Sequence, residues 1–395
     1  MFLDVLRRRN PSLLRAAVDL HASGELPANS YVLDLDAITV NAALTAARAS
    51  RHSLRVYAMT KQIGRNPAAI EAIGKGGIDA GVAVDMACAR ALVRAGAVLG
   101  HVGHLVQVPT REAREAAAMR PEHWTVFNLE RAAEAAAASA ELGRSQPLLA
   151  RVHDVGDRFY PGHEGGFPAG EAVRVAEALD RLEGAEFAGV TTFPALLFDQ
   201  SSGEVRPTPN LATLERVAEE LRGAGYAEIE VNAPGTTSVE VLRTLADAGA
   251  TQVEPGHGLT GTTPAHALSD LPDLPAMLYL SEVSHVHAGR AFCFGGGLYV
   301  DPVFPEYQIQ ALVGGSADEA LANPVDAFLP APAAIDYYGQ LDAAARPGDA
   351  VVFGFRAQAF FTRANVAALS GVAAGSPRVE GIFDASGRAV EGTAG

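Results

Sequence analysis

The chain has 395 residues, of which 48% are hydrophobic and 19% charged, and its formal net charge is −15. A chain of this length buries a large core and forms two domains, or one large domain with an appendage. The acidic balance disfavours nucleic acid and anionic membranes as partners. The only cysteines, Cys88 and Cys293, cannot build a disulfide framework, so we expect a reduced, cytoplasmic setting.

Residues 1–29 carry an amphipathic pattern, which predicts a helical segment that packs on one of the domains. Residues 30–272 alternate between short apolar runs and alanine-rich helical patterns. The apolar runs predict strands at residues 31–35, 54–59, 78–82, 99–103, 124–127, 148–152, 187–192, 228–231 and 251–253. Helices are predicted between them, at residues 37–49, 84–94, 129–142, 170–182, 211–222 and 239–248.

This alternation of strands and helices is typical of a parallel sheet. So many repeated units favour a closed (β/α)8 barrel of the TIM type over an open sheet. Nine strands are one too many for such a barrel. The surplus disappears if the first run, residues 31–35, pairs with strands of another domain.

Beyond residue 272 the helical alternation stops. Short apolar runs separated by Gly and Pro predict strands at residues 276–286, 290–294, 307–313 and 350–355. We therefore expect a mostly-β C-terminal domain over residues 273–395.

Lys61 follows the run 54–59, in a loop that belongs to the mouth of the predicted barrel, where barrel enzymes keep their chemistry. It is one of two lysines among 31 basic residues. Burial can depress the pKa of a lysine, unlike that of an arginine, and frees an amine that forms Schiff bases. We expect this role for Lys61, and a chance surface lysine is the alternative.

The last two barrel loops are rich in Gly, Ser and Thr, whose backbone N–H groups and hydroxyls suit a phosphate at a helix start. A phosphate site on these loops is a recurrent feature of barrels. The candidate residues are Asn232, Gly235, Thr236, Thr237, Gly256, His257 and Gly258. Together with Lys61 and the carboxylate of Glu254 they fit pyridoxal 5'-phosphate, although simple tight turns are the alternative for the glycines.

These features resemble the alanine-racemase-like, fold-type III pyridoxal-phosphate enzymes, and within them most closely the YhfX-like proteins. The resemblance covers nearly the whole chain and is most specific at residues 58–61, around Gly256 and at residues 293–297. It implies a barrel plus a β-domain to which the first strand returns, and a homodimer with shared active sites. It also implies that Lys61 carries the cofactor and acts as a base on one face of the substrate.

The same resemblance assigns further roles. Arg158 would lie near the cofactor's phenolic oxygen or the substrate carboxylate, and Phe193 would stack on the pyridine ring, with a core position as the alternative. Glu254 stands where alanine racemases have arginine and where the fold-type III decarboxylases have glutamate. A carboxylate at the ring nitrogen favours the pyridinium, which makes the ring a full electron sink. Capping of the next helix is the alternative for Glu254.

Racemases of this fold take a second base, a tyrosine, from the partner's β-domain, and Phe294 falls at that position. Its neighbour Cys293 is a candidate thiol acid/base, although a buried inert cysteine is the commoner outcome. Weaker candidates for proton transfer are Tyr299, Tyr337, Tyr338 and His285. Candidates for substrate binding are Arg158, His104, Tyr337 and Arg356, the last with a salt bridge as the alternative. His101 and His104 lack a third ligand, so no metal site is predicted.

The sequence thus predicts a cytoplasmic pyridoxal-phosphate enzyme of amino-acid metabolism that deprotonates Cα of a small amino acid. An amino-acid racemase or epimerase is the leading reading. A decarboxylase is the main rival because of Glu254, and a β-eliminating lyase is the third. A non-catalytic pyridoxal-phosphate-binding protein is a remote alternative, since such proteins are usually lone barrels.

Overall fold

A computed structural model describes residues 1–299, 303–304 and 308–390. The chain divides into two compact units, which are treated separately below. One unit contains residues 42–60 and 73–258, and the other contains residues 1–41, 61–72 and the part from 259 onward. No helix within the described ranges has both the length and the apolar character that a bilayer crossing requires.

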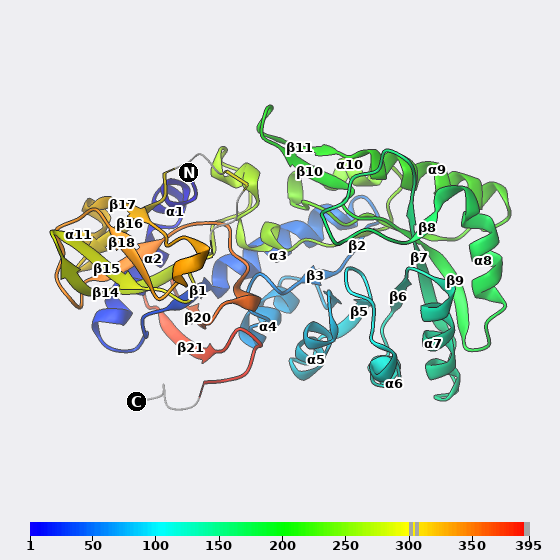
Figure 1. The fold of residues 1–395 in the computed structure, drawn as a ribbon, viewed down its shortest axis with the longest axis horizontal. Coiled ribbons are helices and arrows are strands. Elements are labelled where there is room, and N and C mark those ends of the chain that lie inside the picture. Colours follow the sequence, from blue (N-terminus) through cyan, green and yellow to red (C-terminus); the bar gives the residue numbers. More distant parts are fainter. Residues whose placement is uncertain (300–302, 305–307, 391–395) are drawn as a thin grey trace. The chain divides into compact units, whose positions relative to one another are not determined.

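The first unit is built on a closed parallel sheet (Figure 1). Its strands are β2 (Arg55–Val56), β3 (Ala58–Met59), β4 (Ala80–Ala83), β5 (Val98–Val102), β6 (His123–Val126), β7 (Gln146–His153), β9 (Ala185–Thr191), β12 (Glu230–Asn232) and β13 (Gln252–Val253). Only Tyr57 separates β2 from β3, so the two together occupy one strand position of the barrel. Because β2 pairs with β13 and β3 pairs with β4, the sheet closes on itself. This is the predicted (β/α)8 barrel.

Helices cover the outside of this barrel. They are α5 (Met86–Arg94), α6 (Ala113–Ala118), α7 (Leu129–Ala140), α8 (Ala172–Asp180), α9 (Pro209–Gly223) and α10 (Leu242–Asp247). Helix α3 (Leu35–Ser50) is divided between the two units, and most of α4 (Pro67–Lys75) belongs to the second. Helix α7 shows why they form: alanine is the best helix former, and the side chain of Asn128 caps the first turn. Its inner face carries Ala132, Ala135 and Ala136, spaced one helical turn apart and buried.

Several elements of the barrel unit have no counterpart among the predicted ones, and helix α6 is one of them. A hairpin of β10 (Leu196–Asp199) and β11 (Glu204–Pro207) stands between β9 and α9. The short strand β8 (Phe167–Pro168) pairs with β7. These three strands are only two to four residues long, too short for hydrophobic periodicity to reveal them.

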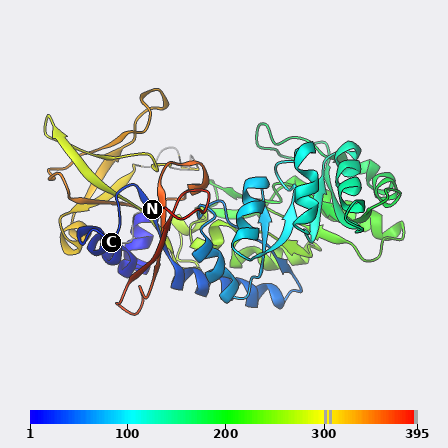
Figure 2. The same ribbon diagram turned by 90° about the horizontal axis from the view of Figure 1, so that it is seen from below.

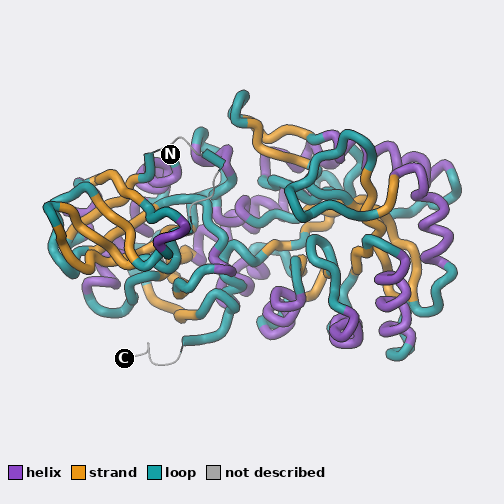
Figure 3. Tube along the Cα trace, in the orientation of Figure 1, coloured by secondary structure: helices purple, strands orange, loops and turns teal. Residues whose placement is uncertain are grey.

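The second unit contains a nine-stranded sheet, drawn as orange segments that cross one another in Figure 3. Its strands are β1 (Ser30–Asp34), β14 (Met277–His287), β15 (Arg290–Phe294), β16 (Gln310–Gly314), β17 (Pro324–Phe328), β18 (Tyr338–Leu341), β19 (Ala350–Phe353), β20 (Asn365–Ser370) and β21 (Arg378–Phe383). Strand β1 pairs with β14 and β20, so this run, expected as the surplus strand, lies in the β-sheet. Tyr307, at the start of an expected strand, lies outside the described residues.

The N-terminal helices α1 (Phe2–Arg9) and α2 (Pro11–Ala22) lie along this sheet (Figure 2). Their apolar side chains share one buried cluster with strand residues of the sheet. Leu13 and Leu14 of α2 and Val32 of β1 are each at most 1% exposed. Together these elements form the mostly-β domain that follows the barrel, in agreement with the predicted fold class.

One histidine inside the barrel couples the fold to pH. His123, the first residue of β6, has its Nδ1 atom 3.2 Å from the Tyr57 hydroxyl and 3.4 Å from Gln252 Nε2. Burial, followed by the nearby His101, lowers the pKa of His123 from 6.5 to about 4. The unfolded chain therefore binds a proton between these pH values that the folded chain does not bind.

This difference predicts a stability that is present above pH 6.5 and declines as the pH falls toward about 4. We expect His123→Gln to reduce the loss of unfolding free energy between these pH values by about 1–3 kcal/mol, because glutamine does not titrate. Urea unfolding at several pH values measures it, and His287→Gln, at an exposed position of β14, is the matched control. An unchanged pH profile in His123→Gln would contradict the assignment.

Candidate active site

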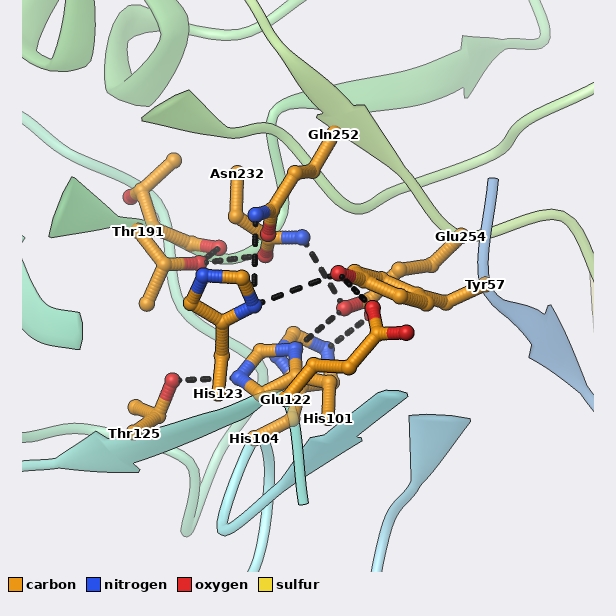
Figure 4. A network of polar contacts seen from close by, with 11 residues as sticks. Tyr57, His101, His104, Glu122, His123, Thr125, Thr191, Asn232, Gln252 and Glu254 are labelled. Carbon is orange, nitrogen blue, oxygen red and sulfur yellow. Dashed lines mark hydrogen bonds and ion pairs between the residues drawn. The ribbon is translucent and has the colours of Figure 1, made fainter. Parts of the chain in front are cut away.

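Polar side chains gather inside the barrel at the carboxyl ends of its strands (Figure 4). Barrels of this type usually fill their interior with branched apolar residues, and their active sites lie at this end. Each of these side chains is on a different strand or strand end, and each residue is at most 4% exposed. They are His101, Thr125, Thr191, Asn232 and Glu254.

Glu254, which directly follows β13, is the centre of this cluster. Its Oε1 atom accepts from His101 Nδ1 at 2.6 Å and from Asn232 Nδ2 at 3.0 Å. Its Oε2 atom faces His104 Nε2 at 3.1 Å. Asn232 is in turn fixed by Thr191, whose hydroxyl donates to Asn232 Oδ1 at 2.7 Å. The carboxylate is thus held both by the adjacent strand β12 and by residues of β5 and the segment after it, which are not next to β13 in the sheet.

The electrostatic balance keeps Glu254 ionised. Burial alone raises the pKa of a carboxyl group. Here the facing His104 and His101, together with the hydrogen bonds from His101 and Asn232, outweigh burial and hold the pKa of Glu254 below its ordinary value. An ionised carboxylate that is sealed from water attracts a cation or a charged hydrogen-bond donor.

The two oxygens of Glu254 are used unequally. Oε1 already has two donors, which match its two lone pairs. Oε2 accepts no hydrogen bond from any residue between 1 and 390 that the structure describes, and has only the ion-pair contact with His104. One lone pair of Oε2 is therefore available to a donor that a bound molecule brings.

His101, His104 and Glu254 also bring their donor atoms within 4.8 Å of one another, the arrangement from which metal sites are built. The separation of 2.6 Å between His101 Nδ1 and Glu254 Oε1 argues for a hydrogen bond instead. Two ligand atoms on one zinc ion, each at about 2.1 Å, are separated by roughly 3.4 Å in tetrahedral geometry. We therefore describe this cluster as a hydrogen-bond network.

The two glycine-rich loops adjoin each other. A side-chain carbon added at Gly258 would lie 2.6 Å from the Thr237 carbonyl oxygen, and one added at Gly235 would lie 2.6 Å from the Leu196 backbone nitrogen. Only glycine permits so close an approach of backbone to backbone. This packing accounts for the two glycines as tight turns, the alternative that the sequence left open, and it does not test their proposed role at a phosphate. Thr236 and His257 lie in the same two loops.

Asn232 has a different environment from the one expected. We predicted it at the phosphate, but its side chain lies inside the barrel, 0% exposed, between Glu254 and Thr191. Its amide therefore orients the carboxylate. The correction follows from its position as the last residue of β12, where the side chain points inward and precedes the loop itself.

Phe193 borders the same cluster. Its ring centroid lies 5.6 Å from that of His104, 5.7 Å from that of Tyr160 and 6.2 Å from that of His163. Phe193 is only partly buried, so one side of this aromatic group remains accessible. An apolar ring beside the carboxylate network suits the expected stacking on a flat ligand.

Two arginines lie near this end of the barrel. Arg158, which we expected at the site, is exposed, whereas Arg151 is buried. Arg158 has an exposed side chain, and its backbone is held by Asn210. Arg151 of β7 is 1% exposed, and its Nη2 atom donates to the His163 carbonyl oxygen at 2.7 Å. Its Nε and Nη1 atoms have no hydrogen-bond partner among the described residues. Burial lowers the pKa of Arg151 to about 10, so the guanidinium stays charged at neutral pH.

Lys61 stands two residues after the end of β3 in the chain. Within the second unit its Nζ atom lies 5.8 Å from the centroid of the Phe360 ring. The side chain is partly buried, whereas that of Lys75, at the end of α4, is exposed. The two lysines of the chain therefore have different environments, and Lys61 is the one that is partly buried next to an aromatic ring.

The expected candidates in the β-domain differ in accessibility. Cys293 is 0% exposed, and burial raises the pKa of its thiol to about 11. Its enclosure and its raised pKa both count against an acid/base role at neutral pH, so the structure gives its expected catalytic role no support. Phe294 is 37% exposed and Tyr337 is 62% exposed, while Arg356 is partly buried.

Sequence reasoning missed the inward-facing polar residues of the strands. Thr125 and Thr191 interrupt otherwise apolar runs, and Arg151 does the same in β7. A polar residue at an inward position of a buried strand was the available signal, but the inward positions of a strand become known only when its register is known.

The chain is similar to known protein families and to a curated protein. The family described as "Alanine racemase, N-terminal domain" matches residues 33–264, and the family described as "YhfX-like, C-terminal domain" matches residues 278–379. The Escherichia coli K12 protein described as "Uncharacterized protein YhfX" is 38% identical over 393 residues, which cover 99% of this chain and 100% of that protein.

Solved structures share the fold at low sequence identity. D-threonine aldolase from Filomicrobium marinum has a TM-score of 0.66 at 18% identity, over 91% of this chain and 95% of that one. D-threo-3-hydroxyaspartate dehydratase from Delftia sp. HT23 has a TM-score of 0.61 at 20% identity, over 90% and 97%. Alanine racemase from Clostridium difficile 630 has a TM-score of 0.61 at 15% identity, over 91% and 99%.

Proposed function

Because the chain belongs to the family of YhfX-like proteins with an alanine racemase N-terminal domain, we propose that it is a pyridoxal-phosphate enzyme acting at Cα of a small amino acid. Enzymes of the alanine racemase fold depend on this cofactor. The observation that carries the proposal is the buried, ionised Glu254, whose Oε2 atom keeps a lone pair for a donor that is not part of the protein.

The described residues fit this cofactor at three places. The ring nitrogen, when protonated, supplies the donor that Glu254 Oε2 lacks. The backbone around Gly235 and Gly258 suits the phosphate. Phe193 offers an apolar face for the ring. The bound cofactor would supply an electron sink for negative charge at Cα, and the ionised Glu254 would keep its ring nitrogen protonated.

The other assignments are proposals of the same kind. We propose that Lys61 binds the cofactor covalently and moves the proton at Cα. Thr236, Thr237, Gly256 and His257 would complete the phosphate site. For the carboxylate of the substrate we propose Arg158 or Arg356, and we add Arg151, because two of its nitrogens lack acceptors among the described residues.

Further candidates for substrate contact are His104 and Tyr337. A cytoplasmic homodimer with shared active sites agrees with the family and is likewise proposed.

For the reaction that follows deprotonation we propose β-elimination first. Phe294 carries no exchangeable side-chain proton, and Cys293 is enclosed with a pKa of about 11. Both observations favour a reaction that needs a proton carrier on one face only. The neighbours with this fold include an aldolase and a dehydratase. Racemisation or epimerisation, which the resemblance favours, is the second candidate, and decarboxylation remains the alternative that Glu254 suggests.

The covalent assignment predicts a visible absorbance band in the cofactor-loaded protein. Borohydride should fix the label on Lys61, as read by peptide mass spectrometry. Lys61→Ala should lose the band completely, because no other amine replaces this one. Lys75→Ala, which alters an exposed helix end, is the control and should keep it. A label on Lys75, or none in the wild-type chain, would sink the assignment.

The reaction type is tested by incubating L- and D-amino acids, with and without a β-hydroxyl group, with the loaded enzyme in D₂O. β-Elimination predicts a keto acid with ammonia, because breaking the Cα–H bond and then the bond from Cβ to its leaving group yields an enamine that hydrolyses. Inversion with deuterium at Cα and no keto acid would establish the racemase instead. Release of CO₂ would establish the decarboxylase.

A further inference from the structure

The hydrogen-bond chain from Thr125 through His101 to Glu254 suggests a role that no residue assignment above includes. We propose that His101, supported by Thr125, is a positioning residue that orients the Glu254 carboxylate and sets the charge of the cofactor's ring nitrogen. This inference rests on the proposed function, because it presumes a pyridine ring at Glu254 Oε2.

The proton positions follow from the acceptor chemistry. An ionised carboxylate oxygen only accepts, so the contact of 2.6 Å at Glu254 Oε1 requires a proton on His101 Nδ1. The other ring nitrogen, Nε2, lies 2.5 Å from the Thr125 hydroxyl oxygen. A hydroxyl both donates and accepts. His101 therefore keeps both hydrogen bonds whether its ring is neutral or cationic.

This versatility matters because the carboxylate is sealed from water. His101 and Glu254 side chains are 0% and 1% exposed, so a change of charge at one group must be matched at its neighbour.

Asn232 shows by contrast what His101 adds. Asn232 also donates to Glu254 Oε1, at 3.0 Å, and is itself fixed by Thr191. An amide does not titrate, so it orients the carboxylate without exchanging a proton. Of the two donors to Oε1, only His101 can both orient the carboxylate and exchange a proton.

Thr125 is the residue through which the proposal is tested, because Thr125→Val exchanges a hydroxyl for a methyl group of similar size. Without the hydroxyl, His101 Nε2 loses its hydrogen-bond partner, so the ring is held toward Glu254 by one contact instead of two and fixes the carboxylate less firmly. Thr125→Ser restores the hydroxyl and is the rescue variant. His123→Gln, in the same barrel but outside this hydrogen-bond chain, is the matched control.

The measurement is the affinity of the cofactor-free chain for pyridoxal phosphate and for its 1-deaza analogue, in which C–H replaces the ring nitrogen. We expect the wild-type chain to prefer pyridoxal phosphate by roughly tenfold or more, the value of a charge-assisted hydrogen bond. Thr125→Val and His101→Gln should lose most of that preference through weaker binding of pyridoxal phosphate, with unchanged affinity for the analogue. Thr125→Ser and His123→Gln should keep it.

Three results would overturn the inference. Equal affinity of the wild-type chain for the two compounds would show that Glu254 makes no contact with the ring nitrogen. An undiminished preference for pyridoxal phosphate in Thr125→Val would show that the hydrogen bond from Thr125 to His101 has no role. A divalent metal that copurifies with the wild-type chain and is lost in His101→Gln and His104→Gln would mean that the cluster holds an ion instead. If the wild-type chain binds neither compound, the proposed function itself fails.

Discussion

A carboxylate enclosed in a protein interior must be matched by donors or cations, because the cost of removing it from water is otherwise too large for a fold to bear. Glu254 is held in this way by residues from three elements of the barrel. His101 comes from β5, Asn232 from β12, and His104 from the segment after β5. The carboxylate therefore exists in its observed position only because the barrel closes and brings these elements together.

The barrel contributes more than a scaffold to this arrangement. Parallel strands end at one rim, so residues far apart in sequence, such as His101 and Glu254, come into contact there. The close approach of the loops at Gly235 and Gly258 belongs to the same rim. At this end the inward-facing side chains of the strands are polar where apolar packing would be more stable, which indicates a binding role for this end of the barrel.

The fold was largely predictable because strands and helices of the barrel alternate with clear apolar periods. Strands β17, β18, β20 and β21 were missed. In β17 and β18, residues such as Asp326 and Gln340 dilute the apolar pattern. Glu254 was found through the motif that contains it. The task of Asn232 was misjudged, and Thr125 was overlooked, because the sequence does not show which strand residues point inward until the register is known.

The central claim is that the carboxylate of Glu254 is ionised inside the barrel at neutral pH. An infrared difference spectrum between the wild-type chain and Glu254→Gln, recorded at pH 7 without cofactor, tests it directly. The account predicts that the wild-type chain contributes the symmetric and antisymmetric stretches of a carboxylate. The C=O stretch of a protonated carboxyl group in their place would contradict it.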